Sequence, residues 1–284
     1  MVKDLREKTA AGMMDCKKAL TECDGDMEKA VDWLRQKGLS KAAKKAGRAT
    51  SEGLVGFELA ADGKSGVAVE VKCETDFVFQ GFVKDMVAQV AKGEYADSEA
   101  LLAAPFVADA SVTVKEALDG VIATTGENMG LGKFAKMELA AGKSGLIGGY
   151  LHSNGKLAVL VEMQTGSDAA AASEAFHEVA KNVAMQIAAA SPLAVSAEGL
   201  NPEVVEHERE VYRQKAREEG KPEQIIEKIA EGAVKKFCKD VCLLDQLYIR
   251  DDKMTISDLI KGAAKTIGEP ITVVRFVRIQ LGAE

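Results

Sequence analysis

Two short segments of the sequence carry the Gly-Lys-Ser ending of a phosphate-binding loop. They are Gly63-Lys64-Ser65 and Gly142-Lys143-Ser144. A phosphate-binding loop also needs a glycine five residues before its second glycine, where this chain has Glu58 and Met137. Both segments are therefore predicted to be turns, and the chain is not expected to bind a nucleotide itself.

The residues that could hold a metal or act as nucleophiles are scattered along the sequence. The histidines His152, His177 and His207 fall in different predicted elements, and no two cysteines have the spacing of a zinc site. The sequence has no Gly-x-Ser-x-Gly motif, and its carboxylates fall mostly on amphipathic helices, where a solvated face is the ordinary interpretation. We therefore expect no metal, no cofactor and no catalytic residue, and the chain is predicted not to be an enzyme.

The clearest candidate for function is a segment that differs between two related parts of the chain. Sliding the sequence by 92 residues aligns Thr75-Asp76-Phe77-Val78-Phe79 with Ser167-Asp168-Ala169-Ala170-Ala171. Only the first copy carries bulky apolar side chains here. Asp76 could cap the following helix with Phe77 in the core, or the segment could protrude as a wedge, and the pattern leaves both interpretations open. His152 also belongs to one copy alone, and it could be a contact or a surface bystander.

The elements that position this segment follow from the same repeat. Each copy predicts a β-hairpin with an Asx-Gly turn, at Asp62-Gly63 in the first copy and at Asn154-Gly155 in the second. An apolar helix is expected after each hairpin, over residues 82–91 and 170–190. The sequence thus predicts two related α+β subdomains.

Helical patterns precede the first copy and interrupt the second. Residues 2–46 predict three helices, the third over 27–36, with Asp24 or Asp26 as its cap. Residues 203–239 predict an antiparallel helical hairpin inserted into the second subdomain, which a helix over 255–264 and a strand over 271–281 then complete. The expected units are 1–48 (three-helix N-terminal docking module), 49–142 (first core subdomain), 143–202 with 243–284 (second core subdomain), and 203–242 (inserted helical hairpin).

Charge and hydropathy narrow the class of partner and the compartment. A formal net charge of -7 disfavours nucleic-acid binding, so the partner is expected to be a protein. The start of the chain carries acids, and no apolar stretch of about 18 residues follows it, which predicts a cytoplasmic protein without a membrane partner. One segment is basic although the whole chain is acidic. It contains no acid, could be a solvated linker or a docking patch, and includes Lys37, Lys41, Lys44, Lys45 and Arg48.

Two signatures in the sequence resemble those of a known family. The segment Thr9-Ala10-Ala11-Gly12-Met13-Met14-Asp15-Cys16-Lys17-Lys18-Ala19-Leu20 resembles the opening signature of bacterial elongation factor Ts, and Cys73-Glu74-Thr75-Asp76-Phe77-Val78 resembles the second signature of that family. Gly126-Glu127-Asn128 fits as well, and the match runs from residue 2 to the end. Two departures are Ala11 in place of a common glycine and a shortened stretch between Val78 and Phe82.

The resemblance implies a guanine-nucleotide exchange factor for elongation factor Tu. By this analogy, Thr75, Asp76, Phe77 and Val78 intrude near the Mg²⁺ site of the GTPase and displace the metal. The residues that match partner-facing positions of the family are Arg6, Met13, Met14, Lys17, His152, Ile249 and Arg250.

The fold class expected from both lines of reasoning is α+β. An N-terminal three-helix bundle, similar to ubiquitin-associated modules, precedes two related hairpin-plus-helix subdomains with an inserted antiparallel helical hairpin. The oligomeric state stays open, because that hairpin could seal a homodimer or a 2:2 complex, cover its own core or contact the GTPase. Two other functions remain as alternatives, an RNA-associated or ribosome-associated scaffold and a small-molecule enzyme with its site between the subdomains.

Overall fold

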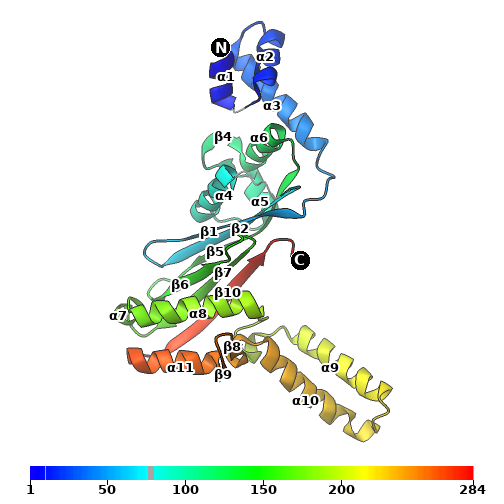
Figure 1. Cartoon of the computed structure of the whole chain (residues 1–284), viewed down its shortest axis with the longest axis vertical. Coiled ribbons are helices and arrows are strands. Elements are labelled where there is room, and N and C mark those ends of the chain that lie inside the picture. Colours follow the sequence, from blue (N-terminus) through cyan, green and yellow to red (C-terminus); the bar gives the residue numbers. More distant parts are fainter. Residues whose placement is uncertain (10, 76–79, 284) are drawn as a thin grey trace.

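The two β-hairpins form the centre of the computed structural model, which describes residues 1–9, 11–75 and 80–283 (Figure 1). Strand β1 (Glu52–Leu59) pairs with β2 (Ser65–Cys73), and β6 (Ser144–Leu151) pairs with β7 (Leu157–Thr165), both antiparallel. At the turns, Gly63 and Gly155 share a φ of 67°, a left-handed conformation that glycine adopts at little cost. The prediction of two hairpins with Asx-Gly turns is confirmed.

A third antiparallel strand completes each sheet. Strand β5 (Met129–Glu138) joins β2, and β10 (Ile271–Gln280) joins β7, which gives the strand orders β1-β2-β5 and β10-β7-β6. The central strands β2 and β7 are buried along most of their length, as their near-continuous apolar sequences require.

The repeat extends well beyond the hairpins. Helices α6 (Val114–Thr125) and α11 (Ile256–Ile267) each follow a short β-ribbon, begin with a capping box and end at a left-handed glycine. Their capping threonines, Thr113 and Thr255, are 142 positions apart rather than 92, because the inserted hairpin lies between the two halves of the second copy. The ribbons are β3 (Pro105–Phe106) with β4 (Asp109–Thr113) and β8 (Leu247–Tyr248) with β9 (Asp251–Thr255).

The two sheets stack against each other, and helices cover their outer faces (Figure 1). An apolar cluster that includes Val55, Ala68, Ile147 and Leu160 fills the space between the sheets. Each sheet also has its own cluster on the helical side. The result is four layers, helix on sheet on sheet on helix. The covering helices besides α6 and α11 are α4 (Gln80–Lys92), α5 (Ser98–Ala103), α7 (Asp168–Ala171) and α8 (Glu174–Ala190).

Reciprocal hydrogen bonds join the two hairpins. The amide of Val55 donates to the carbonyl of Gly155 at 2.7 Å, and the amide of Ile147 donates to the carbonyl of Gly63 at 2.8 Å. Donors and acceptors are both related by the 92-residue repeat, so the two copies meet through matching surfaces, as subunits do in a twofold dimer. In each sheet, the edge strand β1 or β6 uses a backbone amide in this contact.

The N-terminal helices pack on the first copy through α6. The three helices are α1 (Val2–Thr9), α2 (Met13–Glu22) and α3 (Met27–Ala43), and Asp26 caps the third by accepting from the amides of Glu28 and Lys29. The expected end of α3 at residue 36 was wrong, because the helix continues through Gly38. At Gly38 the helix packs closely on α6, where a Cβ would lie at an ordinary contact distance of 3.5 Å from Ala123.

The inserted hairpin consists of α9 (Pro202–Glu218) and α10 (Glu223–Val241), which project from the end of the molecule opposite the N-terminal helices (Figure 1). Arg213 of α9 donates to Glu227 of α10 at 2.8 and 2.9 Å and so ties the two arms together. The prediction of a single helix over 170–190 was wrong in one respect, because the structure has two helices there, α7 and α8. The second begins where the Ser173 side chain accepts a hydrogen bond from the amide of Phe176. Among the described residues, no helix has the length and apolar character to cross a membrane.

Candidate functional site

Strand pairing brings two of the sequence motifs together. Cys73 ends β2 and lies opposite Met129, which begins β5. Because the strands are antiparallel, Glu74 and Thr75 leave the sheet beside Asn128 and Glu127, the residues that enter it. The motifs noted separately in the sequence, 73–78 and 126–128, therefore meet at one corner of the first sheet.

Specific hydrogen bonds hold this junction. The Glu74 carboxylate accepts from the amide of Asn128 at 2.6 Å. The Glu127 carboxylate accepts from the Thr75 hydroxyl at 2.7 Å and from the Thr75 amide at 3.3 Å. The Cys73 thiol donates to the carbonyl of Thr75 at 2.7 Å. The chain is thus held on both sides up to Thr75, the last residue described before the segment with the sequence Asp76-Phe77-Val78-Phe79.

Arg48 closes the junction from the N-terminal side. Its guanidinium lies 3.4 Å from the Glu74 carboxylate, and its carbonyl accepts from the buried Asn128 side chain at 2.7 Å. The Asn128 amide and then Arg48 hold the pKa of Glu74 below its ordinary value. Glu74 is therefore a carboxylate at neutral pH, and it links the first sheet to the connection that follows α3.

Several side chains of the basic stretch 37–48 bind to neighbouring parts of the chain and so hold the N-terminal helices in place. Lys37 donates to Asp15 at 2.7 Å, within the three-helix bundle. Lys45 donates to the carbonyl of Gly126, and Arg48 pairs with Glu74, so both reach the first copy. Together with the ion pair between Arg35 and Glu116, these contacts anchor the bundle on the core. Lys44 is exposed to solvent.

Of the wedge residues expected from the sequence, the structure places only Thr75. Its side chain is exposed at the junction described above. Asp76, Phe77 and Val78 lie outside the described residues, as does Phe79. Helix α4 is described from Gln80 onward, and Phe82 is buried in the core of the first copy.

The expected contact residues of the N-terminal bundle are all exposed. Met13 and Met14 are 61% and 74% exposed at the start of α2, although methionine is ordinarily a core residue. Lys17 lies one helical turn after Met13, and Arg6 is exposed on α1. The core of the bundle is made by other residues of these helices, among them Leu5 and Cys16. Two exposed methionines in so small a bundle are typical of a protein contact.

The remaining expected contacts lie in the second copy. His152 is exposed directly after β6, and its Nδ1 is 3.0 Å from the Tyr150 hydroxyl. Ile249 is 49% exposed in the turn between β8 and β9. Its amide donates to Gln186, a buried side chain of α8, at 2.9 Å, while Arg250 donates to Asn182 at 3.3 Å.

Sequence reasoning missed two residues at this turn. Leu247 is 58% exposed two positions before Ile249, and the buried Gln186 holds the turn by donating to the Leu247 carbonyl and accepting from the Ile249 amide. An apolar residue two positions before Ile249 was a usable signal for Leu247. A glutamine between apolar residues, in the stretch Ala184-Met185-Gln186-Ile187-Ala188, was the corresponding signal for Gln186.

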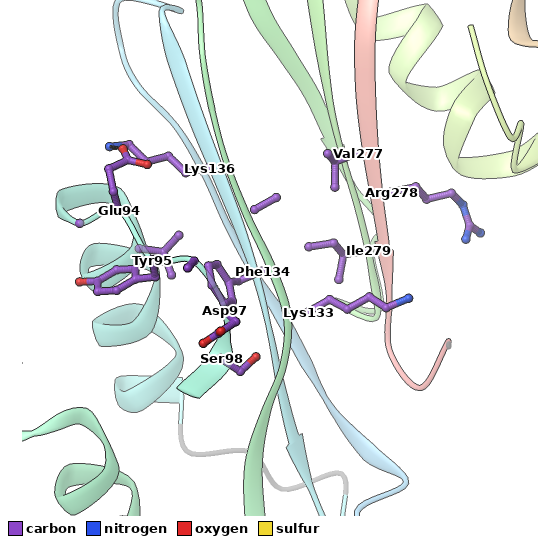
Figure 2. A pocket seen from close by; sticks show the side chains of 14 residues that line it. Glu94, Tyr95, Asp97, Ser98, Lys133, Phe134, Lys136, Val277, Arg278 and Ile279 are labelled. Atoms are coloured by element: carbon purple, nitrogen blue, oxygen red, sulfur yellow. Dashed lines mark hydrogen bonds and ion pairs between the residues drawn. The ribbon is translucent and has the colours of Figure 1, made fainter. Parts of the chain in front are cut away.

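A hollow of about 500 Å³ lies where a small-molecule site between the two copies was considered (Figure 2). Lys136 on its rim pairs with Glu94 at 2.7 Å and with Glu138 at 2.8 Å, and these carboxylates raise the pKa of the lysine. Arg278 points to the other side of β10 and donates to the carbonyl of Ala188. Lys136, Glu94 and Arg278 are thus engaged with protein partners, so these three groups give no support to an acid or base role.

The motifs rejected on the sequence are turns in the structure as well. Gly63 and Gly142 both have left-handed backbones in reverse turns, and Lys64 lies 3.3 Å from the carbonyl of Gly145. Within residues 1–9, 11–75 and 80–283, no three His, Cys, Asp or Glu side chains come together as a metal site.

Comparisons with known proteins agree over the whole chain. A family model described as Elongation factor TS matches residues 74–283. A protein of Lawsonia intracellularis named Elongation factor Ts is 57% identical over 289 residues, which cover 100% of this chain and 98% of that protein. Proteins of the same name from Nitratidesulfovibrio vulgaris (strain DP4) and Clostridium novyi (strain NT) are 59% and 49% identical, over 100% and 99% of this chain and 95% and 92% of their own lengths.

Proposed function

Because the chain belongs to the elongation factor Ts family, we propose that it is a guanine-nucleotide exchange factor for elongation factor Tu. It binds the GTPase in its GDP form, promotes the release of GDP and lets GTP bind in its place. The observation that carries the proposal is the similarity to proteins named Elongation factor Ts from end to end. We place this activity in the cytoplasm.

The proposed mechanism acts on the metal of the GTPase. Mg²⁺ demands near-ideal octahedral geometry, so a small displacement of its protein ligands weakens its hold on the β-phosphate. Asp76 and Phe77, flanked by Thr75 and Val78, enter beside that site in the partner. A phenyl ring can displace a neighbouring helix by packing alone, without any chemical step. The chain itself therefore acts as a binding protein and not as a catalyst of bond making.

Further contacts supply the affinity that such a displacement requires. Arg6, Met13, Met14 and Lys17 form one docking surface on the N-terminal bundle. His152 forms a second in the other copy, and Ile249 with Arg250 forms a third. Support for these roles comes from the exposure of the side chains and from the rigid elements that hold them.

We also propose that the four units expected from the sequence act as functional modules. Residues 1–48 dock, 49–142 carry the displacing segment, and 143–202 with 243–284 hold the opposite contacts. The hairpin 203–242 is an accessory unit.

Thermodynamic linkage gives a direct test of exchange. If the chain lowers the affinity of Tu for GDP by some factor, GDP must lower the affinity of Tu for the chain by the same factor. We expect titration calorimetry to show much tighter binding of the chain to nucleotide-free Tu than to Tu saturated with GDP and Mg²⁺. Equal affinities for the two forms would rule out exchange, even if a complex forms.

A further inference from the structure

The junction that precedes the displacing segment occurs in both copies of the repeat, which permits an internal comparison. In the first copy Thr75 donates its hydroxyl to Glu127 at 2.7 Å. At the matching positions of the second copy, Ser167 donates its hydroxyl to Glu269 at 2.8 Å. This bond is common to both copies, so the fold alone accounts for it.

A second bond at the junction exists in the first copy alone. Glu74 accepts from the amide of Asn128, whereas the matching residues of the second copy are Gly166 and Pro270. Glycine offers no carboxylate and proline offers no N–H, so neither half of the bond is present there. The additional bond therefore belongs to the copy that carries Phe77 in its sequence.

Arg48 makes the first junction different in a further way. It joins Glu74 through its guanidinium and Asn128 through its carbonyl, and it belongs to the connection between the N-terminal bundle and the first sheet. Asn128 is only 8% exposed, so its amide and side chain are held in place by these partners. Three stretches of chain far apart in sequence thus converge one residue before Thr75.

We propose that Glu74 is a positioning residue for nucleotide exchange, which fixes the chain at the base of the displacing segment and joins it to the N-terminal bundle through Arg48. This inference rests on the exchange function proposed above. Glu74 holds Asn128 and Arg48 and does not itself need to touch the GTPase. Removing the Glu74 charge is therefore expected to lower the rate of nucleotide exchange more than the affinity of the chain for Tu.

The test compares Glu74→Gln with Glu116→Gln in the full chain. Glu116 is a matched control, because its carboxylate also accepts from one backbone amide, that of Thr113, and from one arginine of the N-terminal region, Arg35. Both substitutions weaken the attachment of the N-terminal bundle, but only the first lies at the displacing segment. Release of fluorescent GDP from Tu is followed over a range of chain concentrations, to separate the saturating rate from the half-saturating concentration.

We expect Glu74→Gln to lower the saturating rate about five-fold, as loss of one charge-assisted contact would, with less than about a two-fold change in half-saturation. Glu116→Gln should leave the saturating rate within about two-fold of the native value. Equal effects of the two substitutions on the saturating rate would show that Glu74 has a merely structural role. An unchanged saturating rate in Glu74→Gln would overturn the positioning role, and the exchange function would still stand as long as the native chain accelerates release. If the native chain itself fails to accelerate release, the exchange function fails and the positioning role falls with it.

Discussion

At Glu74, one carboxylate accepts from a backbone amide and from a guanidinium, and the two donors lie on different parts of the chain. Both stabilise the charged form, with the Asn128 amide as the larger influence, and together they hold the pKa of Glu74 below its ordinary value of 4.5. A group whose pKa is lowered by folding stabilises the folded state above its unfolded pKa. That contribution is lost as the pH falls through the lowered pKa.

This linkage predicts a pH-dependent effect of Glu74→Gln on stability. At pH 7 the substituted chain should unfold at a lower urea concentration than the native chain, because the charged acceptor is missing. The difference should begin to shrink below about pH 4.5, where Glu74 becomes protonated in the unfolded native chain, and should be lost once the pH is below the lowered pKa of the folded state. Urea unfolding at several pH values measures it, and a difference that stays constant from pH 7 into the acid range would contradict the assignment.

Elements were predictable wherever their signal is local. The Asx-Gly turns and the alternating strands predicted both hairpins, and their exact 92-residue offset predicted that the copies are related. The second half of the repeat was missed because the inserted α9 and α10 shift its offset to 142, although Thr113 to Glu127 and Thr255 to Glu269 share capping boxes and terminal glycines. The end of α3 depended on tertiary packing and the start of α8 depended on the Ser173 cap, and periodicity shows neither.

Helix α11 offers a test of how much a capping box contributes. The Thr255 hydroxyl accepts from the Asp258 amide at 3.1 Å, so Thr255→Ala should lower the free energy of unfolding by about 1 kcal/mol. Thr266→Ala is a matched control on the same helix, because its exposed hydroxyl only donates back to Gly262. Chemical denaturation of the two variants measures the difference. Equal losses would show that the cap is not the source of the effect.

At the scale of the whole molecule, the structure adds how segments far apart in the sequence are joined. No local pattern showed that residues 73–75 and 126–128 would meet, because their proximity arises from the register of β2 with β5. The hydrogen bond that each hairpin turn accepts from the first strand of the other hairpin likewise depends on both copies being folded. The roles of the exposed contacts came from the family resemblance and remain proposals.

The inserted hairpin is expected to be dispensable for folding. Leu193 donates its amide to Val241 at 2.8 Å and Leu243 donates to Ala194 at 2.9 Å, so the two ends of the insertion are already held side by side. Replacing residues 206–237 with a short Gly-Ser linker should therefore leave one cooperative thermal transition within about 5 °C of the native one. Circular dichroism and calorimetry check this. Loss of cooperative unfolding would show that α9 and α10 stabilise the core.

Nucleotide release tests most directly whether the chain loosens GDP on Tu through Phe77. Fluorescent GDP bound to Tu is chased with unlabelled GDP, with no chain, with the native chain or with Phe77→Ala. We expect strong acceleration by the native chain. Phe77→Ala should have a saturating rate at least about ten-fold lower, with a smaller loss of affinity because the other contacts remain. No acceleration by folded native chain would contradict the function, and full acceleration by folded Phe77→Ala would contradict the proposed site.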